Sequence, residues 1–138
     1  MKILVDMIKE HEGLRLKPYR CTAGKLSIGY GRNIEDRGIT QDEADYLLRN
    51  DIQLCYKELD HFSWFHDLDE ARQFALVDLC FNVGLPSLLS FKNALAAIAE
   101  GDYDRAADEF LDSKWAREDV PEWRSSRIVR MIRTGSYD

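Results

Sequence analysis

The feature that most constrains the fold is a long amphipathic segment between Thr40 and Leu59. Thr40 and Glu43 have the spacing of a capping box, in which two residues satisfy each other's backbone N–H groups at a helix N-terminus. Apolar residues then follow at helical intervals, at Ala44, Leu47, Leu48, Cys55 and Leu59. At about 1.5 Å per residue, a helix over residues 40–59 is roughly 30 Å long. We therefore expect it to bury this stripe and to connect two lobes.

A shorter helix is expected at the amino end of the chain. Apolar residues recur there with helical period, at Ile3, Leu4, Met7 and Ile8. Gly13 is a natural helix stop, so we expect the helix to end at Glu12.

A small antiparallel sheet is expected between these two helices. A turn at residues 22–25 separates an extended segment from the alternating residues 26–31, and a third strand is expected near Asn33. Side chains alternate between the two faces of a strand. Because the apolar residues of the second strand share one face, Ser27 is expected to face away from the small core.

The remainder of the chain has an all-helical pattern. Asp67 or Asp69 can cap a helix that ends near Gly84, and Pro86 begins a short connector. Further helices are expected over residues 91–100 and 102–112, followed by a last helix from about Pro121 that carries Ile128, Val129 and Ile132 inward.

These expectations define an α+β fold in a single domain of residues 1–138. The sheet-containing lobe is expected over about 13–40 and the connecting helix over about 40–59. The helical lobe should span about 60–138, with helix 1–12 packed on it.

Composition narrows the classes of function. The chain is 45% hydrophobic and 32% charged, which is ordinary for a soluble domain, and it lacks the run of about 20 apolar residues that membrane insertion needs. Residues 40–113 hold sixteen acidic and only five basic side chains, which argues against a nucleic-acid partner. We expect a monomer with no export signal, made in the cytoplasm.

The cysteines and histidines indicate neither a disulfide framework nor a metal site. Cys21, Cys55 and Cys80 are odd in number and far apart, and His11, His61 and His66 lack the spacing of metal ligands. We expect no metal and no cofactor. Cys55 and Cys80 lie on apolar helical faces and are expected in the core, whereas His11 is expected at the surface.

The most informative spacing links Glu12, Cys21 and Ser27. Eight residues separate Glu12 from Cys21, and five separate Cys21 from Ser27. This resembles the active-site region of the phage-type lysozymes, glycoside hydrolase family 24, whose pattern is Glu, eight residues, Asp or Cys, five residues, Thr. Ser27 replaces the Thr of that pattern. Residues 81–84, 91–93, 113–115 and 133–138 resemble later landmarks of the family, so the resemblance extends over essentially the whole chain.

The resemblance implies an endolysin-type muramidase that causes host cell lysis. Its substrate would be the β-1,4 bond between N-acetylmuramic acid and N-acetylglucosamine in peptidoglycan glycan strands. It also implies two lobes with a cleft between them, inversion by a positioned water, and sugar contacts from Phe81 and Asn82. Arg124 would correspond to a residue near the catalytic Glu. Such an enzyme would stay in the host cytoplasm until another protein permeabilises the membrane.

Physical chemistry gives the three spaced residues separate tasks. Glycoside cleavage needs an acid that stays protonated near neutral pH to protonate the leaving oxygen. Glu12, at a helix carboxyl end beside a cleft, is expected to favour the neutral carboxyl. Cys21 is expected either to act as a partly ionised thiolate or to orient water with the Ser27 hydroxyl.

Structural rather than functional roles for Phe81 and Arg124, and two other functions of the chain, stay open at this point. Phe81 could be a core residue, and Arg124 could belong to a solvated helix face with Arg127, Arg130 and Arg133. A cysteine peptidase or amidase acting on peptide stems would use Cys21 as nucleophile and His61 or His66 as base. The other candidate is a non-catalytic glycan-binding module, which descends from an enzyme and has lost its catalytic activity.

Overall fold

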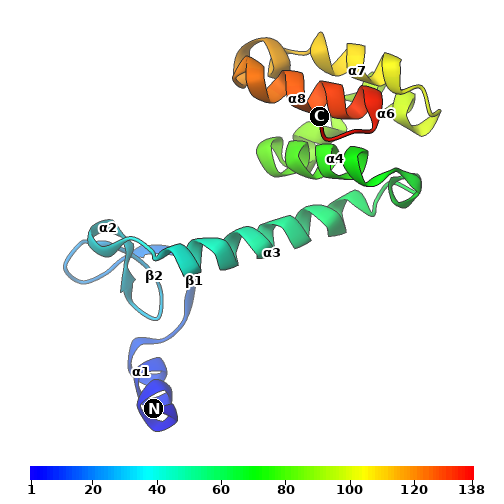
Figure 1. The fold of residues 1–138 in the computed structure, drawn as a ribbon. Coiled ribbons are helices and arrows are strands. Elements are labelled where there is room, and N and C mark those ends of the chain that lie inside the picture. The colour runs from blue at the N-terminus through cyan, green and yellow to red at the C-terminus, as the bar shows by residue number, and fades with distance from the viewer. The chain divides into compact units, whose positions relative to one another are not determined.

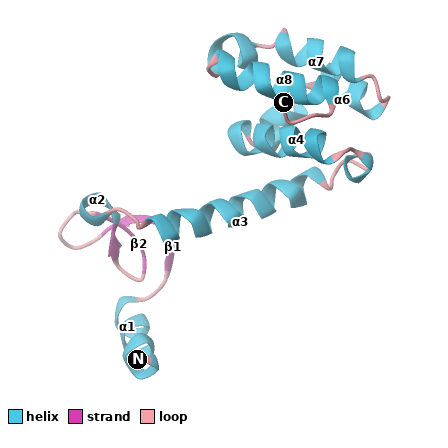
Figure 2. Cartoon of the chain, in the orientation of Figure 1, coloured by secondary structure: helices cyan, strands magenta, loops and turns pink.

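The computed structural model describes all of residues 1–138, and its contacts divide them into two compact units, Met1–Leu47 and Leu48–Asp138. Figure 1 shows the course of the chain and labels most of its elements. All three strands lie in the first unit, and the second unit is helical (Figure 2). The expected α+β class is confirmed.

The first unit contains the predicted helix, hairpin and third strand. Its elements are α1 (Lys2–Glu12), β1 (Arg15–Arg20), β2 (Leu26–Gly29), β3 (Arg32–Asn33) and α2 (Ile34–Arg37). The sheet has the order β1-β2-β3 with antiparallel pairing throughout. α1 ends at Gly13, whose φ of 72° leaves the helical region, as predicted from the glycine. α1 has no buried residue, and its packing on the helical lobe stays a prediction.

The long helix α3 (Gln41–Leu59) begins with the expected capping box. The Thr40 backbone N–H donates to Glu43 Oε1 at 2.8 Å, and the Glu43 N–H donates to Thr40 Oγ1 at 3.2 Å. The prediction that the apolar stripe is buried was wrong for the first half of the helix, where Ala44, Leu47 and Leu48 are exposed. Of the predicted residues, only Cys55 and Leu59 are buried. Periodicity shows that these residues share a helix face, but it does not show whether another element covers that face.

The second unit follows the predicted order of helices. Its elements are the 3₁₀ turn η1 (Phe65–Asp67), α4 (Glu70–Val83), α5 (Leu85–Leu89), α6 (Lys92–Ala99), α7 (Tyr103–Leu111), the π-helical turn η2 (Trp115–Asp119) and α8 (Glu122–Thr134). Asp69 is the residue that caps α4, since its Oδ2 accepts the Arg72 N–H at 3.0 Å. Pro86 lies in the first turn of α5, so the expected connector is itself a short helix.

The hydrophobic core belongs to the second unit. Its fully buried large side chains are Leu59, Phe65, Leu76, Leu79, Leu88, Phe110 and Ile132. Ile128 and Val129 also point inward, as predicted for α8, and Cys55 and Cys80 are confirmed as core residues. None of the helices combines the length and the apolar character that a membrane span requires.

Candidate active site

Glu12 is the last residue of α1 and lies against the turn between β2 and β3. A methyl group placed on Gly31 of that turn would lie 3.0 Å from Glu12 Oε2 and 3.4 Å from its Cδ. The Glu12 side chain is otherwise exposed. The turn therefore contacts one side of the carboxyl group and leaves the rest accessible to a substrate. Coverage of Glu12 by a closed cleft stays a prediction.

Cys21 opens the tight turn of the β1–β2 hairpin. The Cys21 N–H donates to the Lys25 carbonyl at 2.9 Å, and the Gly24 N–H donates to the Cys21 carbonyl at 2.8 Å. This turn also aims the backbone N–H groups of Lys25 and Ala23 at the sulfur. These donors, with a smaller contribution from the Ser27 hydroxyl, lower the pKa of Cys21 below that of an ordinary thiol. The half-buried sulfur is therefore more readily ionised than a free cysteine.

Ser27 corrects one expectation, because it is 1% exposed rather than turned away from the interior. It lies on the central strand, where it pairs with Tyr19 of β1 and Asn33 of β3. Its hydroxyl donates to the Lys25 carbonyl at 3.2 Å and also lies within hydrogen-bonding reach of Cys21. Alternation along β2 still sets Ser27 opposite Leu26 and Ile28, but the face that Ser27 occupies is enclosed by neighbouring residues rather than open to solvent. The structure thus brings Cys21 and Ser27 together.

Phe81 and Arg124 line one groove of the helical unit. The groove has a volume of about 580 Å³, and its walls also include Ile52, Tyr56 and Val77. Phe81 is 47% exposed, which excludes its interpretation as a core residue.

Asp78 holds Arg124 in this groove. The Nε and Nη2 atoms of Arg124 donate to Asp78 Oδ1 at 3.2 and 2.9 Å. A solvated helix face would have its arginines paired with nearby acids. Arg124 has such a partner in Asp78, and Arg133 has one in Asp108 at 2.7 Å. Asp78 is a site neighbour that the sequence did not indicate.

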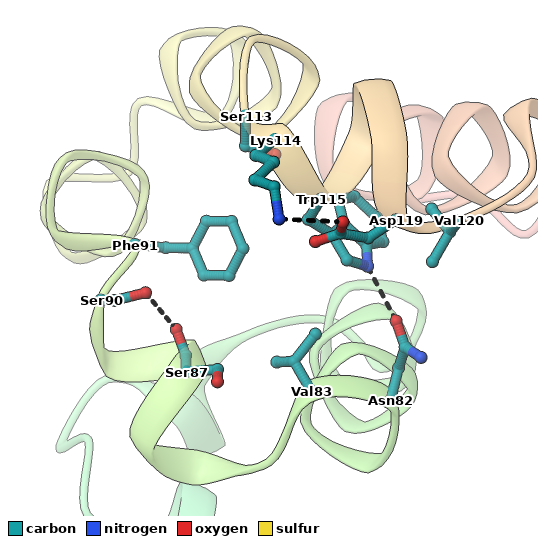
Figure 3. A pocket seen from close by; sticks show the side chains of 10 residues that line it. All are labelled: Asn82, Val83, Ser87, Ser90, Phe91, Ser113, Lys114, Trp115, Asp119 and Val120. Carbon is teal, nitrogen blue, oxygen red and sulfur yellow. Dashed lines mark hydrogen bonds and ion pairs between the residues drawn. The ribbon is translucent and has the colours of Figure 1, made fainter.

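Asn82 faces a different cavity, of about 590 Å³, on the helical unit (Figure 3). The indole N–H of Trp115 donates to Asn82 Oδ1 at 2.8 Å and fixes the amide. Phe91 and Val83 form apolar walls, and the ammonium group of Lys114 lies 3.5 Å from the Asp119 carboxylate (Figure 3). The three expected sugar-contacting residues therefore divide between two cavities of the same unit.

A small antiparallel sheet followed by a helical unit is the architecture expected of a lysozyme-like glycoside hydrolase. The chain belongs to the phage lysozyme family, whose model matches residues 9–137. The family resemblance drawn from the spacing of Glu12, Cys21 and Ser27 is confirmed. This membership does not favour the cysteine peptidase or amidase.

Individual relatives agree with the family assignment. The chain is 27% identical to the Probable T4-type lysozyme 1 of Dictyostelium discoideum, over 96% of this chain and 95% of that protein. It is 36% identical to the Endolysin of Acyrthosiphon pisum secondary endosymbiont phage 1, over 83% of this chain and 77% of that protein. It is 35% identical to the Endolysin of Bacillus phage B103, over 80% of this chain and 43% of that protein.

Proposed function

We propose that this chain is an endolysin-type muramidase that hydrolyses the β-1,4 bond between N-acetylmuramic acid and N-acetylglucosamine, with Glu12 as general acid. The observation that carries the proposal is the position of Glu12 at the end of α1, against the sheet unit in which the turn residue Cys21 lies next to Ser27 of β2. A family match over residues 9–137 supports it.

In the proposed reaction, protonated Glu12 gives its proton to the glycosidic oxygen while the bond from that oxygen to the anomeric carbon breaks. A water molecule held at the Cys21 sulfur, which lies next to the Ser27 hydroxyl, forms the new bond to that carbon. The Cys21 thiolate accepts the proton that this water loses, and exchange with solvent restores both groups. Backbone donors around the sulfur support this role because they stabilise the thiolate. Attack by water from the opposite face inverts the anomeric centre.

Sugar binding is proposed for Phe81, Asn82 and Arg124. The exposed ring of Phe81 offers an apolar face to a pyranose, and the fixed amide of Asn82 offers a directed polar contact. Arg124 is held by Asp78 with hydrogen-bond donors left over.

The experiment that tests the function compares Glu12→Gln with Glu10→Gln on purified peptidoglycan. Loss of a general acid costs about 10² to 10⁴-fold in rate. We expect Glu12→Gln to lose the release of new reducing ends by that factor. Glu10→Gln removes a neighbouring exposed carboxyl from the same helix and should keep full activity. An active Glu12→Gln variant that releases amino groups would instead support the peptidase, and wall binding without any product would support the binding module.

We also propose that the enzyme is a monomer that reaches peptidoglycan after another protein permeabilises the host membrane. Expression in the host alone should leave cells intact, and addition of a membrane-permeabilising agent should lyse them. Lysis without such an agent would contradict this proposal.

A further inference from the structure

We infer that the turn Tyr30-Gly31 is a positioning element for the general acid, and that its two residues contact α1 at two points on one helix face. This inference rests on the proposed role of Glu12. It assigns a task to two residues that the proposed reaction does not use.

The first contact is the close approach of Glu12 to Gly31. With a methyl group on Gly31, the distance to Glu12 Oε2 would be 3.0 Å, which is shorter than ordinary van der Waals contact. The carboxyl group therefore occupies the space that a side chain at position 31 would need. A larger residue would move the acid by a few tenths of an ångström, because Glu12 is the more flexible partner.

The second contact joins Lys9 to Tyr30. The Lys9 ammonium group lies 5.3 Å from the centroid of the Tyr30 ring, within the range of a cation–π interaction. Residues three apart on a helix share a face, so Lys9 and Glu12 both face the turn. Within the first unit, these two contacts place the last turn of α1 against the turn that joins β2 to β3.

Gly29 provides a matched control for the backbone. Gly29 and Gly31 both have positive φ, at 72° and 81°, so an alanine at either position is strained, on the order of 1–2 kcal/mol. A Cβ on Gly29 would meet no atom within 4 Å, whereas a Cβ on Gly31 would meet the acid. Gly29→Ala therefore controls for the strain of a side chain at positive φ without contact with Glu12.

The test measures kcat and KM of Gly31→Ala and Gly29→Ala with a soluble glycan substrate. A displacement near 1 Å can cost about 10²-fold in rate, so a smaller shift should cost on the order of tenfold. We expect Gly31→Ala to lose about tenfold in kcat with little change in KM, and Gly29→Ala to lose less than twofold. Equal losses in the two variants would overturn the inference.

A double-mutant cycle separates positioning from a general effect on folding. Aspartate is one methylene shorter and withdraws from the added methyl group, so Gly31→Ala should cost less than twofold in a Glu12→Asp background. Tyr30→Leu should lower kcat, whereas Tyr30→Phe keeps the aromatic face and should preserve it. A tenfold loss for Gly31→Ala in both backgrounds would contradict positioning. An active Glu12→Gln variant would instead contradict the proposed function itself.

Discussion

At the residue scale, the three cysteines differ in acidity because their surroundings differ. Burial raises the pKa of Cys55. Burial is also the main cause that raises the pKa of Cys80, to about 12, and the neighbouring Cys55 adds to the effect. Around Cys21, in contrast, N–H donors lower the thiol pKa. Cys21 should therefore be the first thiol to ionise as the pH rises, and the first to react with an alkylating agent.

Removal of the Ser27 hydroxyl should weaken this effect. When Cys21 ionises, the Ser27 hydroxyl can turn its single hydrogen from the Lys25 carbonyl to the thiolate. Ser27→Ala removes this donor, so the pKa of Cys21 should rise. The measurement is the rate of iodoacetamide labelling of Cys21 against pH, located by peptide mass spectrometry. The midpoint should move to higher pH, and labelling near pH 7.5 should slow about twofold to fivefold. Ser126→Ala removes an exposed hydroxyl from α8 and serves as the control. An unchanged midpoint in Ser27→Ala would show that the hydroxyl does not hold the sulfur.

At the element scale, Glu43 ties β3 to the start of α3. Arg32 donates from both terminal nitrogens to the two Glu43 oxygens, at 2.8 and 2.6 Å. The hydrogen bonds from Arg32, followed by the backbone N–H of Thr40, lower the pKa of Glu43 from 4.5 to about 2. Because the folded-state pKa is lowered, this carboxylate stabilises the fold fully above pH 4.5, and the stabilisation is lost as the pH falls from 4.5 towards 2.

Replacement of Glu43 by Gln should remove that part of the pH dependence. The wild-type melting temperature should fall between pH 5 and pH 2.5. Glu43→Gln should start lower at pH 5 and fall less over the same interval. Thermal unfolding followed by circular dichroism at several pH values measures both curves, and Glu10→Gln should reproduce the wild-type curve. If the melting temperatures of Glu43→Gln and the wild type fell by the same amount over this interval, another acid would have to cause the loss of stability at low pH.

Local signals explain which elements could be predicted from the sequence. The capping box at Thr40 and the glycine stop at Gly13 act through neighbouring backbone groups, so the residues alone were sufficient. The burial of Ser27 depends on residues elsewhere in the chain that enclose its face of the strand, which periodicity within the strand cannot show. In the same way, periodicity shows that Leu47 and Leu48 lie on an apolar helix face, but not whether another element covers that face.

The site shows the same division between local and non-local signals. The spacing pattern made Glu12 and Cys21 the candidate catalytic residues, because catalytic groups of a family keep their separation along the chain. Gly31 and Asp78 are linked to the candidate site only by distance in space, to the carboxyl of Glu12 and to the guanidinium of Arg124. A glycine in a turn, and an aspartate on a helix, carry no local sign of such a contact.

At the scale of the whole molecule, the two units differ sharply in what holds them together. Every buried hydrophobic residue lies between Cys55 and Ile132, and the only buried residue of the first unit is Ser27. Burial of apolar surface is the main favourable contribution to folding, at about 25 cal/mol per Å². The first unit must therefore depend on hydrogen bonds, its ion pairs and its connection to the rest of the chain, and it should be the first to unfold.

This asymmetry predicts that residues 48–138 fold as an isolated fragment, whereas residues 1–47 do not. The helical fragment keeps the whole apolar core, so it should show helical circular dichroism and a cooperative thermal transition. Leu79→Ala in that fragment should cost about 2–5 kcal/mol, because Leu79 is fully buried. The fragment 1–47 should lack a cooperative transition, since a single buried serine supplies no hydrophobic core. A gradual melt of 48–138 that Leu79→Ala leaves unchanged would show instead that the core forms only when both units are joined.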